Sequence, residues 1–148
     1  MTHRTSGFIR AVVVLSGLVL AAGAAACGKN PLDPTNYGVE VTDLRTGNGT
    51  EARIGRGITV HYTLWLYDPG RPEGKGEQIQ STVGGQPYST ILGFGYVIPG
   101  WEVGIPGMKV GGLRRLVIPP EQAYGGIGSG PIPPNATLVF EVELLGVY

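Results

Sequence analysis

Residues 92–112 read LGFGYVIPGWEVGIPGMKVGG and place a large aromatic side chain, Trp101, among glycines and prolines. Pro99 fixes a backbone angle that suits the first turn of a helix. Gly104 and Pro106 then limit that helix to about two turns. The stretch therefore predicts one short helix that carries Trp101, and the simplest role for this tryptophan is packing in the core.

The sequence on both sides of this stretch carries the pattern of β-strands. Residues 60–67 (VHYTLWLY) and 138–144 (LVFEVEL) show the period-two alternation of strands with two distinguishable faces. Shorter strands are predicted at residues 39–44, 88–92 and 113–118. Segments rich in proline and glycine separate them, so the sequence predicts an α+β fold in which one twisted antiparallel sheet wraps around the short helix.

The composition is that of one domain without a nucleic-acid partner. The chain has 148 residues, of which 42% are hydrophobic and 15% charged, which is enough for one domain. The 11 basic residues balance the 11 acidic ones, and no cluster of lysine and arginine marks one face or one arm. We therefore expect no binding to nucleic acid.

The amino-terminal residues have the parts of a signal peptide. His3, Arg4 and Arg10 form a basic start, residues 11–22 are an apolar run, and small residues follow in GAAAC. The apolar run is shorter than the roughly 20 residues that a membrane-spanning helix needs. Residues 1–26 are therefore predicted to be a signal peptide that is removed on export.

Cys27, the only cysteine of the chain, follows this segment directly. The stretch AAAC resembles the lipobox of bacterial lipoproteins, in which the cysteine is acylated, although Ala24 stands where an aliphatic residue such as leucine is usual. We expect lipidation of Cys27, a tether over residues 27–38, and an exported protein that its lipid attaches to a bacterial membrane, with the domain outside the cytoplasm. The alternative is ordinary cleavage after Ala26, which leaves a free thiol.

The available residues exclude several kinds of catalytic site. After removal of the signal peptide, His61 is the one remaining histidine, and no cysteine pair accompanies it as metal ligands. No G-x-S-x-G motif marks a hydrolase nucleophile. The GIGSG of residues 126–130 lacks the lysine and the strand–loop–helix setting of a phosphate-binding loop. We expect no metal and no cofactor.

Four motifs together carry a family resemblance. The sequence contains, in this order, VHYTLWLYD, LGFGYVIPGW, GMKVGGLRRLVIPPEQAYG and IPPNATLVFEVELL. In order and spacing they resemble the motifs of FKBP-type peptidyl-prolyl cis-trans isomerases, and the match covers residues 39–147. The resemblance implies that residues 39–148 form one domain, with a twisted antiparallel sheet half-wrapped around one short helix and a hydrophobic pocket between them.

The resemblance also implies which residues form that pocket. Trp101 would be its floor, the Tyr124 hydroxyl would donate a hydrogen bond to substrate, and the backbone N–H of Ile98 would bind a substrate carbonyl. Together with Tyr62 these residues are the expected catalytic set. The expected substrate-binding residues are Tyr62, Ile79, Gln80, Tyr88, Val97, Ile98, Trp101, Tyr124, Ile132 and Phe140.

The implied reaction is rotation about X–Pro bonds of exported proteins, which assists their folding. Rotation crosses an amide barrier of roughly 18–20 kcal/mol, and no covalent bond breaks. An apolar pocket that removes water from the amide disfavours the polar planar form more than the twisted transition state. We expect an isomerase with proline-containing polypeptides as partners. The alternative is a proline-peptide binding or chaperone module with little or no turnover.

The sequence departs from the family at several positions. Family members usually carry a Phe-Asp pair where this chain has Ile79 and Gln80. Gln80 thus puts a neutral amide in place of a carboxylate that, in the family, helps to orient Tyr62 and bound ligand. Leu64 and Thr90 also replace the usual residues, a glycine and an aromatic. A charge-assisted hydrogen bond is about twice as strong as a neutral one, so we expect reduced catalytic rate and reduced affinity for macrolide inhibitors. The resemblance further implies a monomer.

Overall fold

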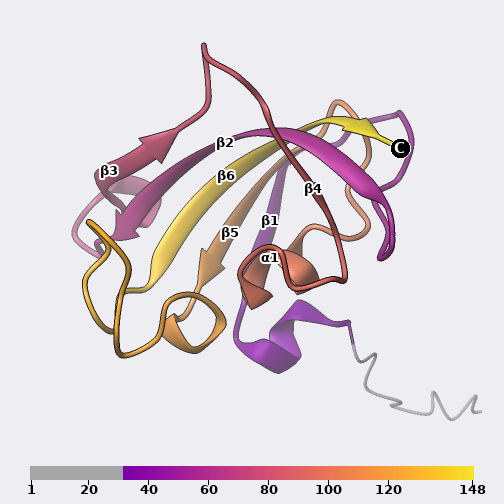
Figure 1. Cartoon of the computed structure of the whole chain (residues 1–148). Helices are drawn as coiled ribbons and strands as arrows, with labels where there is room; N and C mark the ends of the chain where they lie inside the picture. Colours follow the sequence, from indigo (N-terminus) through magenta and orange to yellow (C-terminus); the bar gives the residue numbers. More distant parts are fainter. Residues whose placement is uncertain (1–31) are drawn as a thin grey trace, which may run out of the picture.

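The structure is a computed structural model that describes residues 32–148. Its elements are one six-stranded antiparallel sheet and one short helix beneath it (Figure 1), which confirms the predicted α+β class. In chain order they are β1 (Glu40–Arg45), β2 (Gly57–Tyr67), β3 (Lys75–Ser81), β4 (Tyr88–Ile91), α1 (Pro99–Gly104), β5 (Leu113–Ile118) and β6 (Leu138–Val147). Short 3-10 helices lie at Pro34–Tyr37, Pro72–Gly74 and Pro120–Gln122.

The sheet is built around its longest strand, β2. The strand order is β1-β5-β6-β2-β3, and β4 also pairs with β2. One edge of β2 pairs with β6 over nearly its whole length. The other edge is shared, because its first residues, Gly57 to Val60, pair with β4 and its last, Thr63 to Tyr67, pair with β3. The sheet curves over α1 as a result of this arrangement (Figure 1).

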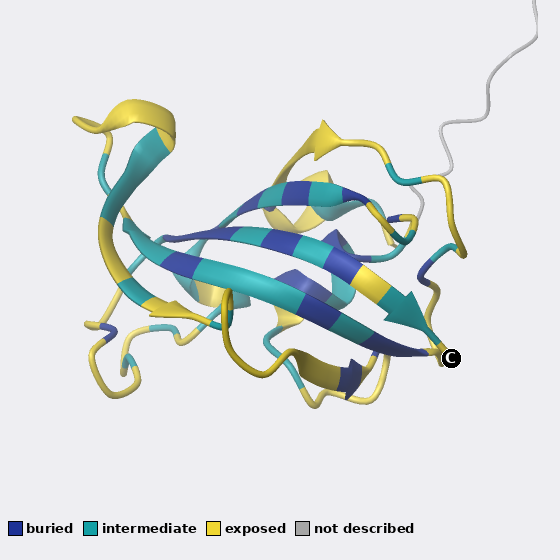
Figure 2. Ribbon diagram, turned by 90° about the horizontal axis from the view of Figure 1, so that it is seen from above, coloured by how far each residue is buried: buried dark blue, intermediate teal, exposed yellow. Residues whose placement is uncertain are grey.

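The concave face of the sheet holds the hydrophobic core. Val60 of β2 lies opposite Leu144 of β6, and Leu64 lies opposite Phe140. All four side chains are at most 3% exposed. Figure 2 shows buried and partly exposed residues alternating along these strands, as the period-two pattern predicts.

The helix α1 approaches β5 closely because two of its residues have no side chain. A Cβ atom on Gly100 would collide with Ile118, and one on Gly104 would lie 2.9 Å from Leu116 Cδ2. Glycine inside a helix costs about 1 kcal/mol relative to alanine. Here it allows the helix to pack directly on the sheet and to insert Trp101 between helix and strands.

Strand β3 is an element that the sequence pattern does not predict. Its sequence, KGEQIQS, has no apolar alternation, and its first residues belong to the Pro/Gly-rich segment that reads as a turn. The strand forms because β2 offers it a partner edge, with Thr63 opposite Ser81 and Leu64 opposite Gln80. Such tertiary pairing routinely overrides the weak intrinsic preference of a short segment.

The predicted signal peptide and Cys27 lie outside the described residues, as does the first part of the predicted tether. The rest of that tether is folded. Pro34–Tyr37 forms a 3-10 helix beside α1 and β1, and the Asp33 carboxylate accepts a hydrogen bond from the N–H of Thr35 at 3.0 Å. These residues therefore belong to the domain rather than to a free linker. Within residues 32–148, no helix has the length and apolar character needed to cross a membrane.

Candidate active site

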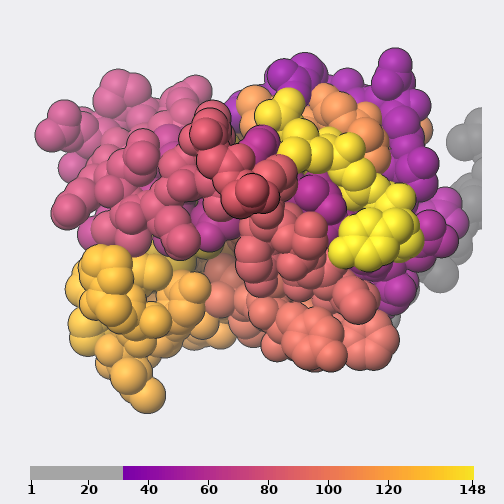
Figure 3. Space-filling model, turned by 45° about the horizontal axis from the view of Figure 1, so that its top comes forward, coloured from indigo at the N-terminus to yellow at the C-terminus, as the bar shows by residue number. Residues whose placement is uncertain are grey.

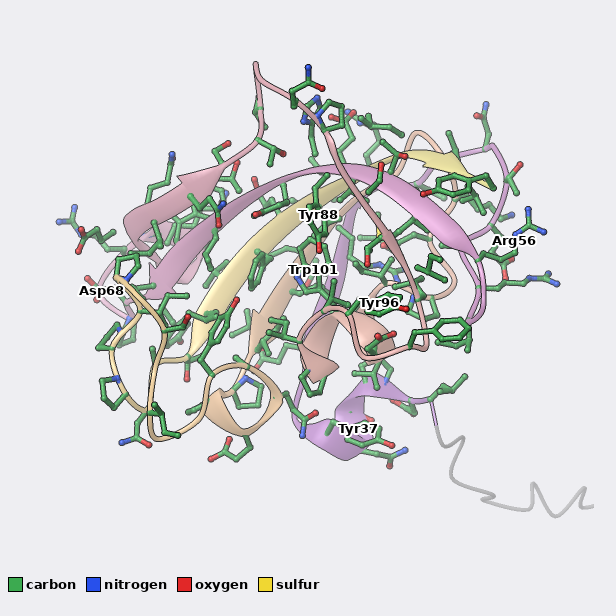
Figure 4. All side chains as sticks on the ribbon, in the orientation of Figure 1. Tyr37, Arg56, Asp68, Tyr88, Tyr96 and Trp101 are labelled. Atoms are coloured by element: carbon green, nitrogen blue, oxygen red, sulfur yellow. The ribbon has the colours of Figure 1, made fainter. Side chains whose placement is uncertain are left out.

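Trp101 occupies the space between α1 and the sheet. Its ring makes edge-to-face contacts with Tyr62, Phe140 and Tyr88, at centroid distances of 5.2, 5.4 and 6.1 Å. Figure 4 shows Trp101 rising from the helix with Tyr88 above it. Each such aromatic pair contributes about 0.5–1.5 kcal/mol beyond the burial of its area. The indole is therefore held in one orientation by β2, β4 and β6.

A pocket of about 340 Å³ opens beside this aromatic cluster. It is lined by Tyr62, Leu64, Gln80, Tyr88, Tyr96, Val97, Ile98, Trp101, Tyr124 and Phe140. The structure thus brings together all the predicted site residues except Ile79 and Ile132. Their roles toward a substrate remain predictions.

Ile79 and Ile132 are not among the side chains that line the pocket, although both pack with the core cluster that contains Trp101 and Phe140. Leu64 of β2 lies opposite Gln80, but the next residue, Trp65, lies opposite Gln78, so Ile79 is the extra residue of a β-bulge. Its side chain packs against the core. Ile132 is 7% exposed, and it exchanges two backbone hydrogen bonds of 2.9 Å with Ser129, which closes the loop after Tyr124.

Leu64 and Tyr96 are pocket residues that the sequence prediction missed. Leu64 follows Tyr62 by two positions on the same strand, so its place on the pocket face could have been found from the alternation alone. Tyr96 lies in the loop between β4 and α1, where no periodicity applies. The sequence feature that could have indicated its place at the pocket is that Tyr96 directly precedes two predicted pocket residues, Val97 and Ile98.

Several polar groups of the residues that line the pocket have no hydrogen-bond partner among the described residues. Among the described residues, the N–H of Ile98 has no acceptor, although its carbonyl accepts from the N–H of Trp101 at 2.9 Å. The buried indole Nε1–H of Trp101 also lacks a partner within residues 32–148. No acceptor or donor in that range engages the Tyr124 hydroxyl or the Gln80 side-chain amide. The apolar pocket therefore contains unused hydrogen-bond donors.

The surroundings of the pocket favour the protonated, neutral form of two tyrosine hydroxyls, those of Tyr62 and Tyr124. Burial raises the pKa of Tyr62, and the nearby Tyr124 and Tyr88 raise it further. Burial likewise raises the pKa of Tyr124, with a smaller contribution from Tyr88. Because the usual tyrosine pKa is about 10, both hydroxyls keep their protons and can donate hydrogen bonds at neutral pH.

The other titratable groups near the pocket form no catalytic cluster. Thr82 Oγ1 accepts a hydrogen bond from the N–H of Tyr62 at 3.0 Å and lies 3.2 Å from His61 Nδ1. These contacts join β2 to the chain that follows β3, and neither His61 nor Thr82 lines the pocket. In the described part of the chain, no three His, Cys, Asp or Glu residues are grouped so as to hold a metal ion.

A comparison with known families identifies the domain. The sequence model of the FKBP-type peptidyl-prolyl cis-trans isomerases matches residues 48–145. The chain belongs to this family. It is therefore an enzyme of the isomerase class, and the match confirms the resemblance carried by the four motifs.

Individual FKBP relatives match most of the domain. A protein of Neisseria meningitidis serogroup B named FK506-binding protein is 50% identical over 113 residues, which are 75% of this chain and 97% of the relative. An Arabidopsis thaliana protein named peptidyl-prolyl cis-trans isomerase FKBP15-3 is 47% identical over 116 residues, 77% of each chain.

Solved FKBP structures share the fold. The crystal structure of AtFKBP13 superposes with a TM-score of 0.64 at 37% identity, over 75% of this chain and 94% of the other. That of FkpA from Escherichia coli gives 0.62 at 39% identity, over 74% of this chain and 47% of the other. Both likenesses agree with the six-stranded antiparallel sheet and its short helix.

An FKBP-type isomerase lowers the barrier to rotation about an X–Pro amide, which is roughly 18–20 kcal/mol without a catalyst. The reaction breaks no covalent bond, so the site must only bind the twisted amide more tightly than the planar one. The twisted amide has lost its resonance and is less polar. A pocket lined by aromatic rings, with donors at its edge, is suited to this task, because it removes water from the amide and can still hold a carbonyl oxygen.

Proposed function

We propose that this isomerase turns over X–Pro bonds in the aromatic pocket between α1 and the sheet, and that its substrates are exported polypeptides. The observation that carries the proposal is that Ile98, whose N–H is unpaired among the described residues, and the ring of Trp101 line the same pocket. An apolar ring and a free donor at one place match the two parts of a prolyl amide, its ring and its carbonyl.

Each pocket residue then has a defined task. The substrate proline stacks on the indole of Trp101, whose orientation is fixed by its aromatic neighbours. The N–H of Ile98 donates to a substrate carbonyl, and the Tyr124 hydroxyl donates a second bond as the amide twists. Tyr62 and Phe140 exclude water from the rotating bond. No cofactor takes part in these steps.

The catalytic proposal is tested by the rate of cis-to-trans isomerisation of a short Ala-Phe-Pro peptide. We expect acceleration by the purified protein, together with a change in Trp101 fluorescence on binding. The chain has two tryptophans, so a Trp65→Phe variant isolates the Trp101 signal. Binding at Trp101 without acceleration would contradict the proposal and favour a proline-peptide binding or chaperone module.

We further propose that the protein is exported and held at a bacterial membrane by a lipid on Cys27. Support comes from the basic, apolar and small-residue segments that precede the only cysteine. Expression of the full chain in bacteria should give a membrane-bound, acylated protein, detected by fractionation and mass spectrometry. Cys27→Ser should release it from the membrane, and Ala24→Leu should increase acylation. Membrane association that survives Cys27→Ser would contradict the anchor.

Macrolide binding and a monomeric state complete the proposal. The matched Neisseria protein is named for FK506 binding, and we expect this chain to bind such ligands less tightly because Gln80 supplies no charge. We also propose a monomer, as the family resemblance implies. Light scattering at working concentration should give the mass of one chain, and a dimer mass would contradict this part.

A further inference from the structure

Two aromatic side chains stand exposed on the loop between β4 and α1. Phe94 is 62% exposed and Tyr96 is 67% exposed. Their rings are stacked, with centroids 6.1 Å apart and planes inclined by 16°. Large aromatic side chains are normally buried, and an exposed apolar patch often marks a binding surface. We name this pair the aromatic platform.

The aromatic platform is continuous with the proline pocket. Tyr96 lines the pocket, while Phe94 lies one ring farther out. Figure 4 shows Tyr96 at the edge of the space that Trp101 occupies. In Figure 3 the segment that carries the platform and the loop after Tyr124 stand on either side of a recess. A polypeptide whose proline lies on Trp101 can therefore extend onto the platform without leaving the surface.

The loop that carries the platform is held in place before any substrate binds. The carboxylate of Glu102 in α1 accepts hydrogen bonds from the N–H groups of both Gly93 and Gly95, the second at 2.9 Å. A Cβ atom on Gly93 would lie 2.6 Å from Ile54 Cγ2, so the loop also packs directly on the chain before β2. A surface fixed in this way loses little conformational entropy on binding.

The two chain segments that border the pocket carry no charged side chain beside the platform. Residues 82–101 contain no charged side chain, and neither do residues 122–137, which form the other border of the pocket. Glu102, the nearest carboxylate in sequence, is already engaged by the two backbone N–H groups. Exposed aromatic rings pack favourably with another aromatic side chain, and these two segments offer no carboxylate that would attract a basic one.

We propose that Phe94 and Tyr96 form a subsite for an aromatic side chain of the substrate, two or three residues from the proline. Tyr96 lines the pocket that holds the proline, and the 6.1 Å from its ring to that of Phe94 corresponds to about two residues of extended chain, at about 3.3 Å per residue. The inference rests on the proposed catalytic pocket. It defines the substrates as polypeptides in which an apolar aromatic residue lies near, and not beside, the X–Pro bond.

The test compares kcat/KM for peptides that share one Ala-Pro bond. One peptide has alanine at every flanking position, and the others have phenylalanine two or three residues before or after the proline. We expect a gain of about three- to ten-fold for at least one phenylalanine position. Phe94→Ala should abolish the gain and leave the rate on the all-alanine peptide unchanged, because Phe94 does not line the pocket.

Ile127→Ala is the matched control, since Ile127 is 91% exposed on the opposite border of the pocket. This variant should keep the gain. Equal rates on all peptides with the wild-type protein would overturn the inference, as would a gain that survives Phe94→Ala or is lost in Ile127→Ala. Absence of turnover on every peptide would contradict the proposed catalytic pocket instead. In that case the same peptides and variants would test the platform by binding affinity.

Discussion

At the scale of single residues, the proposed activity depends on a few hydrogen-bond donors inside an apolar pocket. The N–H of Ile98 and the hydroxyl of Tyr124 are free among the described residues, and the raised pKa of Tyr124 keeps its proton in place. Aromatic rings on three sides fix Trp101, which the proline is expected to contact. Of these groups, the hydroxyl of partly exposed Tyr124 can be removed without disturbing the core.

The first prediction concerns the hydroxyl of Tyr124. Tyr124→Phe removes one donor and leaves the ring, so we expect kcat/KM on a short Phe-Pro peptide to fall about 2- to 12-fold, the equivalent of one hydrogen bond. Tyr148→Phe is the matched control, because it removes a hydroxyl outside the pocket. Equal rates for Tyr124→Phe and wild type would exclude a catalytic role for this hydroxyl.

The second prediction concerns Gln80. Gln80→Asp places a carboxylate on the pocket face of β3, and a charge-assisted bond is about twice as strong as a neutral one. We expect tighter binding of FK506, measured by calorimetry, and faster peptide isomerisation. Gln78→Asp adds the same charge on the same strand, where it does not line the pocket, and should change neither. Weaker FK506 binding by Gln80→Asp would show that the neutral amide at position 80 is not what limits the affinity for FK506.

How far the sequence predicts the site depends on the kind of signal each residue carries. Trp101 and Tyr124 lie in motifs whose spacing is fixed, and the structure places both at the pocket. Ile79 carries the same kind of signal but does not line the pocket; it is the extra residue of a bulge in β3, and nothing in the local sequence marks that bulge. Tyr96 lies in a loop, where neither alternation nor a helical period indicates the direction of a side chain.

At the scale of elements, the pocket depends on how α1 is held against the sheet. Arg114 of β5 is 9% exposed and connects three elements. Its guanidinium forms two hydrogen bonds to Asp43 of β1, at 2.6 and 3.1 Å. It also donates to the carbonyls of Gly104 and Pro106 at the end of α1, at 2.9 and 3.2 Å. The helix end therefore has a fixed distance from the sheet.

The third prediction follows from this connection. Arg114→Ala should lower the free energy of unfolding by about 2–3 kcal/mol, because it leaves one buried and one partly buried carbonyl unpaired, while half-exposed Asp43 limits the loss. Arg53→Ala removes an ion pair to Glu51 in which the arginine is 73% exposed, and should cost less than about 1 kcal/mol. Urea denaturation measures both. Equal losses in the two variants would contradict the structural role of Arg114.

Elements differ in how well their sequences predict them. β2 and β6 alternate clearly, and α1 is bounded by proline and glycine, so their positions follow from local sequence. β3 consists of polar residues and glycine and exists because the second half of β2 offers an unpaired edge. The sequence predicts a linker where the 3-10 helix Pro34–Tyr37 lies, because its proline and asparagine are typical of turns. The helix packs beside α1, but no periodic pattern of apolar residues in the sequence indicates this packing.

At the scale of the whole molecule, the chain combines a domain of standard family length with an amino-terminal segment. The Neisseria relative is matched over 97% of its own length, so the matched part of this chain corresponds to a whole protein. We therefore expect residues 28–148 to fold and to act without the preceding segment. The proposed lipid on Cys27 would then determine where the enzyme works and would leave its rate unchanged.

The fourth prediction is the pH dependence of stability. The pKa values of Tyr62 and Tyr124 are raised in the folded state. Burial lowers the pKa of Lys75, but hydrogen bonds to Glu141 and Glu73 outweigh it and leave that pKa raised as well. A group whose pKa is raised on folding contributes its full share of the folding stability below about pH 10. That share is lost as the pH rises through the pKa of the group in the folded state. Urea denaturation should therefore give a falling stability above about pH 10.

The variant Tyr124→Phe shows how much of this loss of stability at alkaline pH comes from the pocket. The variant lacks one of the groups with a raised pKa, so its stability should fall less steeply above about pH 10 than that of the wild type. The activity of the wild type should be constant between about pH 7.5 and 9.5, because the donor hydroxyls keep their protons there. A stability that rises with pH in the alkaline range would contradict the assigned direction of the shifts.

The central claim is that the aromatic pocket is where the X–Pro bond rotates, and one NMR titration tests it most directly. Nitrogen-15-labelled protein, residues 28–148, is titrated with a Phe-Pro peptide while the indole resonance of Trp101 and the amide resonance of Ile98 are followed. Both donors are free among the described residues. We predict that these two resonances shift most and saturate together. Accelerated peptide isomerisation with both resonances unmoved would place the reaction elsewhere on the domain.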